Sequence, residues 1–338
     1  MMGKTEDVTI TELPPGGHSI PHMLVVIVSA LSYLALATWN LYTLYTTQHF
    51  LVMIGEAEPA SGSSQSERYV WRNIDMPPHP ALHIMWLILY AWNLLWVIYS
   101  LVLLFRKKNI GYLYCAPDGG IIHIGTYICF MLGLACLRLY MEPWNEHHRP
   151  TTTAFYFGCA LFMVGALLLC GWRIVHVTEK LEMYYLDKHL WAVRMFAENG
   201  LGIFHSWAFA ASTLFEFTIT LMKDVEVEKA MAQTVGIIVF AFVFMIYAIC
   251  DLGPFGNYNV YTISPYCVWL WVLGATIHPN WEYGDRNAIM VAVLIALVAA
   301  ALLLKFGRII FGLMKYCFEV RRFRKSKKER IISKESSL

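Results

Sequence analysis

Eight separate stretches of mostly apolar residues run through the chain, and a dense group of lysines and arginines follows the last of them. Each stretch has about 20 residues, the length that an α-helix needs to cross a hydrocarbon core of about 30 Å. Inside a membrane, only helices and closed barrels satisfy all of their own backbone hydrogen bonds. The sequence therefore predicts an all-α fold, a polytopic transmembrane helix bundle with about eight spans.

The expected spans follow the apolar runs, with boundaries placed to within about four residues. They cover residues 23–45, 81–105, 120–141, 152–172, 199–222, 231–250, 259–278 and 288–310. Lys305 and Arg308 lie at the end of the last span. We expect these long cationic side chains to snorkel to the membrane interface, because a charge is costly in hydrocarbon.

The composition and the charge distribution agree with a membrane protein. Hydrophobic residues make up 58% of the 338 residues and charged residues only 15%, whereas a typical soluble domain has about 25% charged residues. If both termini are cytoplasmic, most of the 26 lysines and arginines lie on the cytoplasmic side. This bias is the one that the positive-inside rule requires, so we expect cytoplasmic N and C termini in a plasma membrane or an endomembrane.

The chain divides into three parts. Residues 1–22 form a cytoplasmic N-terminal segment, residues 23–310 the membrane domain of eight helices, and residues 311–338 a basic cytoplasmic tail. The membrane domain has two larger loops, an outer loop at 46–80 and an inner loop at 173–198.

The strongest positive charge lies at residues 321–330 of the tail. Its simplest interpretation is a topology signal. Anionic lipids of the inner leaflet are possible partners as well, since each cation near such a surface contributes about 1 kcal/mol. We expect contact with the lipid bilayer and no binding of nucleic acid.

The most suggestive polar residues lie on the fifth expected span. Glu198, His205, Ser212 and Glu216 are separated by seven, seven and four residues. On a regular α-helix these four side chains lie within about 40° of one another and cover about 27 Å of rise. Charged groups inside a membrane usually face a bundle interior or an aqueous cavity. The spacing therefore indicates a polar intramembrane face that is either a path for protons or small cations or one wall of a ligand pocket.

A simpler interpretation of the same residues stays open. Glu198 and Glu216 then lie close to the two membrane interfaces, and only His205 is buried, with a hydrogen bond to a neighbouring helix. Arg138 on the third span is a possible counter-ion for an intramembrane carboxylate, although it also fits an ordinary helix end. Asp251, near an inner boundary, is expected to be interfacial.

No enzyme signature is present in the sequence. It lacks the nucleophile elbow, the zinc-protease helix and the phosphate-binding loop. Glu142, Glu146, His147 and His148 are close together but do not have the spacing of metal ligands. We therefore expect no catalytic residue, no metal site and no cofactor.

Three segments carry a resemblance to known proteins. The Trp- and Tyr-rich segment 83–107 and the segments 198–207 and 281–287 resemble a family of uncharacterised animal multi-pass membrane proteins. The similarity extends through most of residues 80–305 and implies the fold without an activity. The aromatic-rich second span also resembles the tryptophan-rich TspO-like proteins, which have five spans and bind porphyrins and sterols.

Three functions are compatible with these patterns. The polar face of the fifth span favours a channel or transporter-like protein for protons, small cations or small solutes. The alternative is a membrane receptor or sensor, whose small or lipid-like ligand would lie among the aromatic helices. If the polar face is dry and paired, a structural or partner-binding membrane subunit is expected instead.

Overall fold

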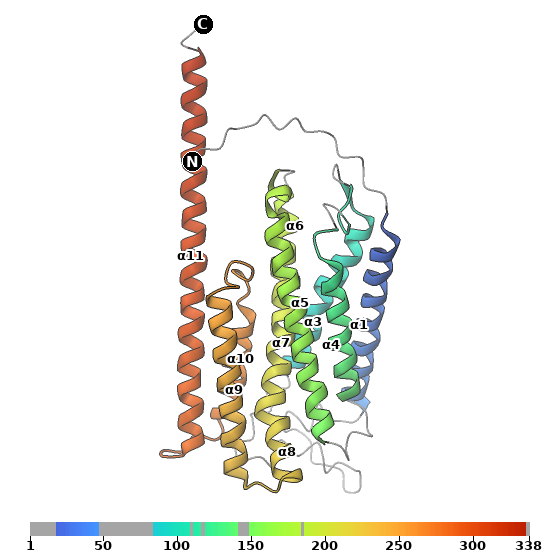
Figure 1. Cartoon of the computed structure of the whole chain (residues 1–338), viewed down its shortest axis with the longest axis vertical. Coiled ribbons are helices and arrows are strands. Elements are labelled where there is room, and N and C mark those ends of the chain that lie inside the picture. The colour runs from blue at the N-terminus through green and yellow to red at the C-terminus, as the bar shows by residue number, and fades with distance from the viewer. Residues whose placement is uncertain are drawn as a thin grey trace.

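The computed structural model describes residues 18–46, 84–108, 111–115, 119–140, 149–183 and 186–335, and these form an elongated bundle of roughly parallel and antiparallel helices (Figure 1). Within these ranges, the strands are confined to the short pair β1 (Lys107–Lys108) and β2 (Gly111–Tyr112). The expected all-α fold is therefore confirmed. Nearly all of the outer loop 46–80 lies outside the described residues.

Four helices form the first part of the bundle. They are α1 (Ile20–Thr46), α3 (Ile84–Phe105), α4 (Ile124–Tyr140) and α5 (Arg149–Met183). Helix α4 packs between α1 and α5, and α3 contacts both α1 and the later helix α7. Helix α5 has 35 residues, so it continues well beyond the apolar run that predicts it.

The middle of the chain is one helix with two changes of winding. It consists of α6 (Asp187–Ala192), the π-helical segment η5 (Val193–Glu198), α7 (Asn199–Ala210), a second π-helical segment η6 (Ala211–Glu216) and α8 (Phe217–Asp224). The residues at each junction keep right-handed helical dihedral angles, so the axis is not interrupted. This composite helix covers the fifth expected span.

Three more helices complete the bundle. They are α9 (Lys229–Leu252), α10 (Ser264–Ile277) and α11 (Arg286–Glu335). Helix α10 packs against both α7 and α11, and α11 also contacts α9. Helix α11 has 50 residues and therefore continues into the region that the sequence divides off as the basic tail.

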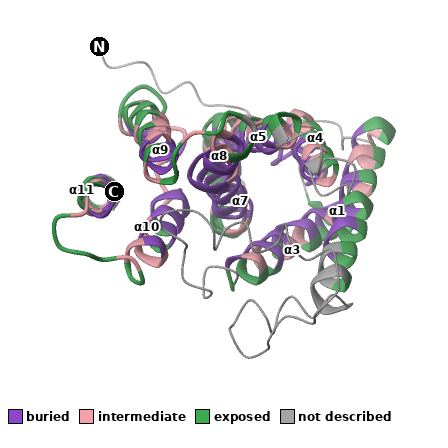
Figure 2. Ribbon diagram, turned by 90° about the horizontal axis from the view of Figure 1, so that it is seen from below, coloured by how far each residue is buried: buried purple, intermediate pink, exposed green. Residues whose placement is uncertain are grey.

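Helix α7 lies in the centre of the bundle, and each of its residues is buried (Figure 2). A helix that is apolar or small on all sides is typical of a core position. Its close approach to α10 depends on Gly202, because a Cβ atom there would lie only 2.5 Å from the Ser264 hydroxyl. The Asn199 side chain strengthens this contact, since its oxygen accepts hydrogen bonds from the backbone nitrogens of Ile263 and Ser264 at the start of α10.

In the part of the chain that the structure describes, five helices are long and apolar enough to cross a membrane: Ile20–Trp39, Ile84–Phe105, Pro150–Glu182, Lys229–Leu252 and Arg286–Gly312. The third and seventh expected spans correspond to two shorter apolar helices, Ile124–Leu139 and Ser264–Ile277. The bundle also exposes many large apolar side chains, as expected for a surface that faces lipid. These features are compatible with an integral membrane protein.

Candidate functional site

The residues predicted to form a polar face lie on a helix that is not regular. In a π-helix the hydrogen bonds run from residue i to i+5, so each turn holds an extra residue and rotates all later residues about the helix axis. Glu198 ends the first π-helical segment, and Ser212 and Glu216 lie in the second. The calculated spread of about 40° assumes 3.6 residues per turn throughout and does not hold for this helix.

His205 is buried in the middle of α7, with 6% of its surface exposed. Its Nδ1 atom lies 3.2 Å from the carbonyl oxygen of Ala160 on α5. Because a carbonyl only accepts hydrogen bonds, Nδ1 carries the proton, and the Nε2 atom of the neutral ring is an acceptor. The ring stacks on Tyr247 with centroids 5.3 Å apart, and Trp269 meets it edge-on at 6.2 Å.

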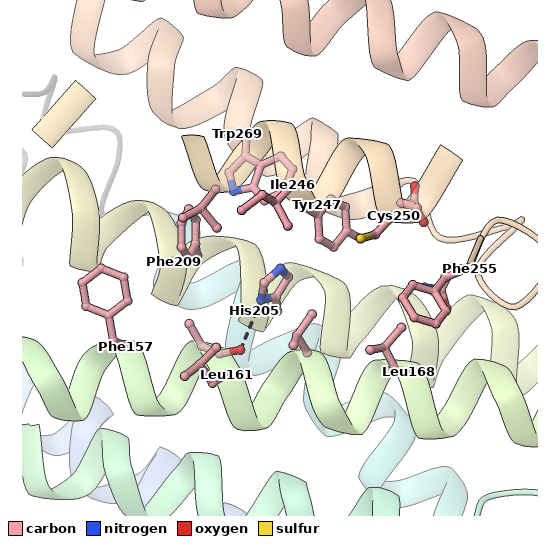
Figure 3. Close-up of a pocket in the computed structure, with 15 residues that line it drawn as sticks. Phe157, Leu161, Leu168, His205, Phe209, Ile246, Tyr247, Cys250, Phe255 and Trp269 are labelled. Carbon is pink, nitrogen blue, oxygen red and sulfur yellow. Dashed lines mark hydrogen bonds between the residues drawn. The ribbon is translucent and has the colours of Figure 1, made fainter. Parts of the chain in front are cut away.

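A cavity of about 220 Å³ lies beside this imidazole, between α5 and α9 (Figure 3). We call it the α5–α9 cleft. Its walls are largely apolar, with Phe157, Leu161, Val164, Phe209, Ile246 and Trp269 among the lining residues. Leu161 is 67% exposed and Ile246 is 46% exposed, so the cleft reaches the lateral surface of the bundle between these two side chains.

Four polar groups line the α5–α9 cleft: His205, Tyr247, Asp251 and Asn259. Each has a buried atom without a hydrogen-bond partner among the residues that the structure describes, namely Nε2 of His205, the Tyr247 hydroxyl, Oδ1 of Asp251 and Oδ1 of Asn259. Most buried polar atoms in folded proteins are paired, because an unpaired one costs about 1–3 kcal/mol. Four such atoms thus belong to residues that line this one cavity.

A buried ion pair adjoins the cleft. The Lys305 ammonium on α11 lies 2.5 Å from Oδ2 of Asp251 at the end of α9, and both side chains are almost wholly buried, with residue exposures of 2% each. The Tyr266 hydroxyl donates a second hydrogen bond to the same oxygen over 2.8 Å. Next to the pair, Arg308 donates to the carbonyl of Leu252 over 2.5 Å.

The expected snorkelling of Lys305 is therefore wrong, and Asp251, at the end of α9, is buried within the bundle. The packing of α11 on α9 and α10 directs the ammonium into the bundle, where the carboxylate offsets part of its desolvation cost. Arg308, also expected to snorkel, bonds a main-chain carbonyl at the end of α9 instead.

Glu198 is separated from the cleft but close to this ion pair. It is 1% exposed, and its Oε1 atom has no hydrogen-bond partner in the described part of the chain. Arg194, Lys305 and Asp251 are the charged groups that act on it electrostatically. Glu198 is therefore buried inside the bundle.

The other predicted residues lie elsewhere. The Ser212 hydroxyl donates to the Phe209 carbonyl of its own helix over 2.9 Å. Glu216 is half-buried near the end of η6, within electrostatic range of Tyr156 on α5. The Arg138 guanidinium lies over the Trp39 ring, 5.3 Å from its centroid. Of the four residues predicted to share a face, only His205 lines the cleft.

Tyr247, Asn259 and the pairing of Asp251 with Lys305 were not predicted from the sequence. One signal was available: Tyr247 and Asp251 are four residues apart, so they lie on the same face of α9. Among the residues that can be placed, no group of three His, Cys, Asp or Glu side chains is arranged to hold a metal ion.

The chain matches no protein-family model, no curated protein and no solved structure.

Proposed function

We propose that the protein is a membrane receptor or sensor that binds a small lipid-like molecule in the α5–α9 cleft. The observation that carries this proposal is the combination of apolar walls with four buried, unpartnered polar atoms. Binding sites for small molecules are typically concave and mostly apolar, with a few polar groups that orient the ligand. An amphipathic molecule matches both features, since its hydrocarbon part covers the walls and its polar end reaches the unpartnered atoms.

The position of the opening supports entry from the membrane. Leu161 and Ile246 are exposed apolar residues within two helices that are long enough to span the bilayer. In the proposed eight-span arrangement with cytoplasmic termini, these residues face the acyl chains. Figure 1 supports an even number of crossings, because α1 begins and α11 ends toward the same end of the bundle. A lipid-like ligand then reaches the cleft without passing through water.

A cavity-filling variant tests this proposal. Val164→Trp places a large ring on the α5 side of the cleft, whereas Val175→Trp adds the same ring to an exposed position of the same helix. The purified proteins are labelled with a photoreactive lipid, and the modified peptides are identified by mass spectrometry. We expect Val164→Trp to lose labelling of the cleft and Val175→Trp to retain it. Equal labelling of both variants would contradict the proposal.

A channel or transporter-like function for protons or small cations is the second proposal. It is favoured by the burial of Glu198, Asp251 and Lys305 within electrostatic range of one another. A pH-driven flux into liposomes should then depend on Glu198 and survive Ser212→Ala. A protein that neither conducts nor binds the lipid probe would instead be assigned to the structural or partner-binding membrane subunits.

A further inference from the structure

We infer that the ligand of the α5–α9 cleft is an apolar alcohol, a hydrocarbon body with one uncharged hydroxyl group at its polar end. This inference rests on the proposed function and identifies the class of molecule that the same cleft takes. It depends on which hydrogen-bonding roles the polar lining leaves open, on the charge balance beside the cleft, and on the shape of the apolar walls.

The unpartnered atoms of the lining residues are mainly acceptors. Nε2 of His205 is an acceptor because the other ring nitrogen carries the proton that the Ala160 carbonyl accepts. Asp251 already receives two hydrogen bonds at Oδ2, and its free Oδ1 atom accepts only. The free Oδ1 atom of Asn259 is an acceptor as well. A ligand that satisfies this lining therefore has to donate.

The Asn259 amide and the Tyr247 hydroxyl can also donate. The Tyr247 hydroxyl is buried and unpartnered among the described residues, and it can donate as well as accept. The Tyr247 ring stacks beside His205, and Figure 3 shows the two side chains next to each other in the cleft. A ligand hydroxyl has the matching pair of roles, because it donates to an acceptor such as Nε2 of His205 and accepts from Tyr247.

The charge balance argues against the two charged alternatives. Asp251 and Lys305 carry opposite charges and neutralise each other. The head of a fatty acid or phospholipid would place a negative charge against Oδ1 of Asp251 and the other acceptors. A fatty amine would bring an additional positive charge into a nearly apolar cavity without a free counter-ion, and burying such a charge is costly. An uncharged hydroxyl avoids both penalties.

The shape of the cleft fits a hydrocarbon body. Its volume of about 220 Å³ exceeds the roughly 150 Å³ of an apolar cavity that holds benzene. Phe209 and Trp269 form part of its aromatic wall, and Leu161 and Ile246 stand at the lateral opening. The hydroxyl therefore lies at the inner end beside His205, and the hydrocarbon extends toward the membrane.

Competition for a photoreactive alcohol tests the inference on the full chain in detergent or nanodiscs. The probe is a straight-chain alcohol with a diazirine and an alkyne, and the competitors are the alcohol, the fatty acid, the amine and the alkane of the same chain length. We expect the alcohol to prevent labelling of the cleft at a concentration at least tenfold lower than any other competitor. If all four compete equally, the hydroxyl inference is wrong although the cleft still binds lipid. If none competes, the proposed function fails as well.

Two variants test which side chains cause the preference for the alcohol over the alkane. His205→Phe keeps an aromatic ring but removes the acceptor, and we expect the tenfold advantage of the alcohol over the alkane to disappear while the alkane competes as before. Tyr247→Phe removes only a hydroxyl and gives the same readout should the first variant fold poorly. Ser212→Ala is the matched control, because Ser212 is polar and buried on the same helix but bonds its own backbone. An undiminished alcohol preference in both cleft variants would overturn the inference.

Discussion

Helices α9 and α11 meet through polar residues at two levels, and the two contacts differ. Near the start of α9, the Thr234 hydroxyl lies 2.7 Å from Oδ1 of Asn287, and Arg286 donates to the same hydroxyl over 2.6 Å. The Asn287 amide also donates to the Ala230 carbonyl over 3.0 Å. The polar atoms of the Thr234 and Asn287 side chains are thus hydrogen-bonded within the protein.

At the end of α9, the polar groups are not all matched. Asp251 binds Lys305 and Tyr266 through one oxygen, while its other oxygen is buried without a partner in the described chain, and the residue lines the α5–α9 cleft. A saturated network rigidifies the contact between two helices, whereas an unsaturated one carries a cost that a ligand can remove. The two contacts therefore differ in whether their polar atoms are paired, although both are buried.

The largest expected effect comes from breaking the ion pair at the end of α9. Lys305→Met leaves the Asp251 carboxylate buried without its counter-ion, and we expect the free energy of unfolding to fall by roughly 3–5 kcal/mol. Thermal denaturation of the detergent-solubilised protein measures this loss. Combining Lys305→Met with Asp251→Asn removes both charges and should recover most of the stability. A double variant as unstable as the single one would show that the pair contributes little.

The saturated contact at the start of α9 should respond differently. Thr234→Val removes the hydroxyl that Arg286 and Asn287 share, so we expect a loss of about 1–3 kcal/mol, the cost of leaving buried partners unpaired. Labelling of the cleft by the photoreactive alcohol should stay unchanged, because this contact does not line the cavity. A loss of labelling in a variant that remains folded would contradict the assignment of the two contacts to stability and to binding.

The sequence predicts the helices well because hydrophobic length is a local property. Each of the eight apolar stretches coincides with a helix, and five of these helices meet the length and composition of a membrane span. Helix α10 has 14 residues, so it spans only about 21 Å at 1.5 Å per residue. Pro265 marks this start in the sequence, because proline is common in the first turn of a helix, whereas the expected span placed it in the interior.

The site was harder to predict because it depends on winding and on distant contacts. The segment 211–216 carries no residue type that distinguishes π-helical from α-helical winding, so the common face of Glu198, His205, Ser212 and Glu216 could not be tested from spacing. Lys305 and Asp251 are 54 residues apart, and only the packing of α11 brings them together. Only His205, one buried imidazole on an apolar helix, could be identified as a candidate from the sequence alone.

A smaller effect on stability is expected from His205→Phe, the variant that separates binding from folding. The imidazole donates one hydrogen bond, to the Ala160 carbonyl, and losing it should cost about 0.5–1.5 kcal/mol. Phenylalanine keeps the ring between Tyr247 and Trp269. We expect a modest drop in the denaturation midpoint together with a large loss of alcohol selectivity. A large loss of stability would instead make His205 a structural residue, comparable to Thr234 at the saturated contact.

The smallest expected effect on stability comes from a histidine outside the membrane-spanning helices. This effect depends on pH. Burial, together with the nearby charges of Arg106 and Lys108, lowers the pKa of His189 below its ordinary value of 6.5. Its Nδ1 atom lies 2.9 Å from the Tyr99 hydroxyl, within a described contact between α6 and α3. As the pH falls through 6.5, the unfolded chain binds a proton before the folded one does, so acid reduces the stability that this contact contributes.

Thermal midpoints of the parent and of His189→Gln, measured between pH 7.5 and 5.5, test this sign. The parent should lose more stability on acidification than the variant, because glutamine does not titrate. The exposed His176 on α5 provides the control, and His176→Gln should follow the parent. If His189→Gln also follows the parent across this range, the contact with Tyr99 is not what makes the fold sensitive to acid.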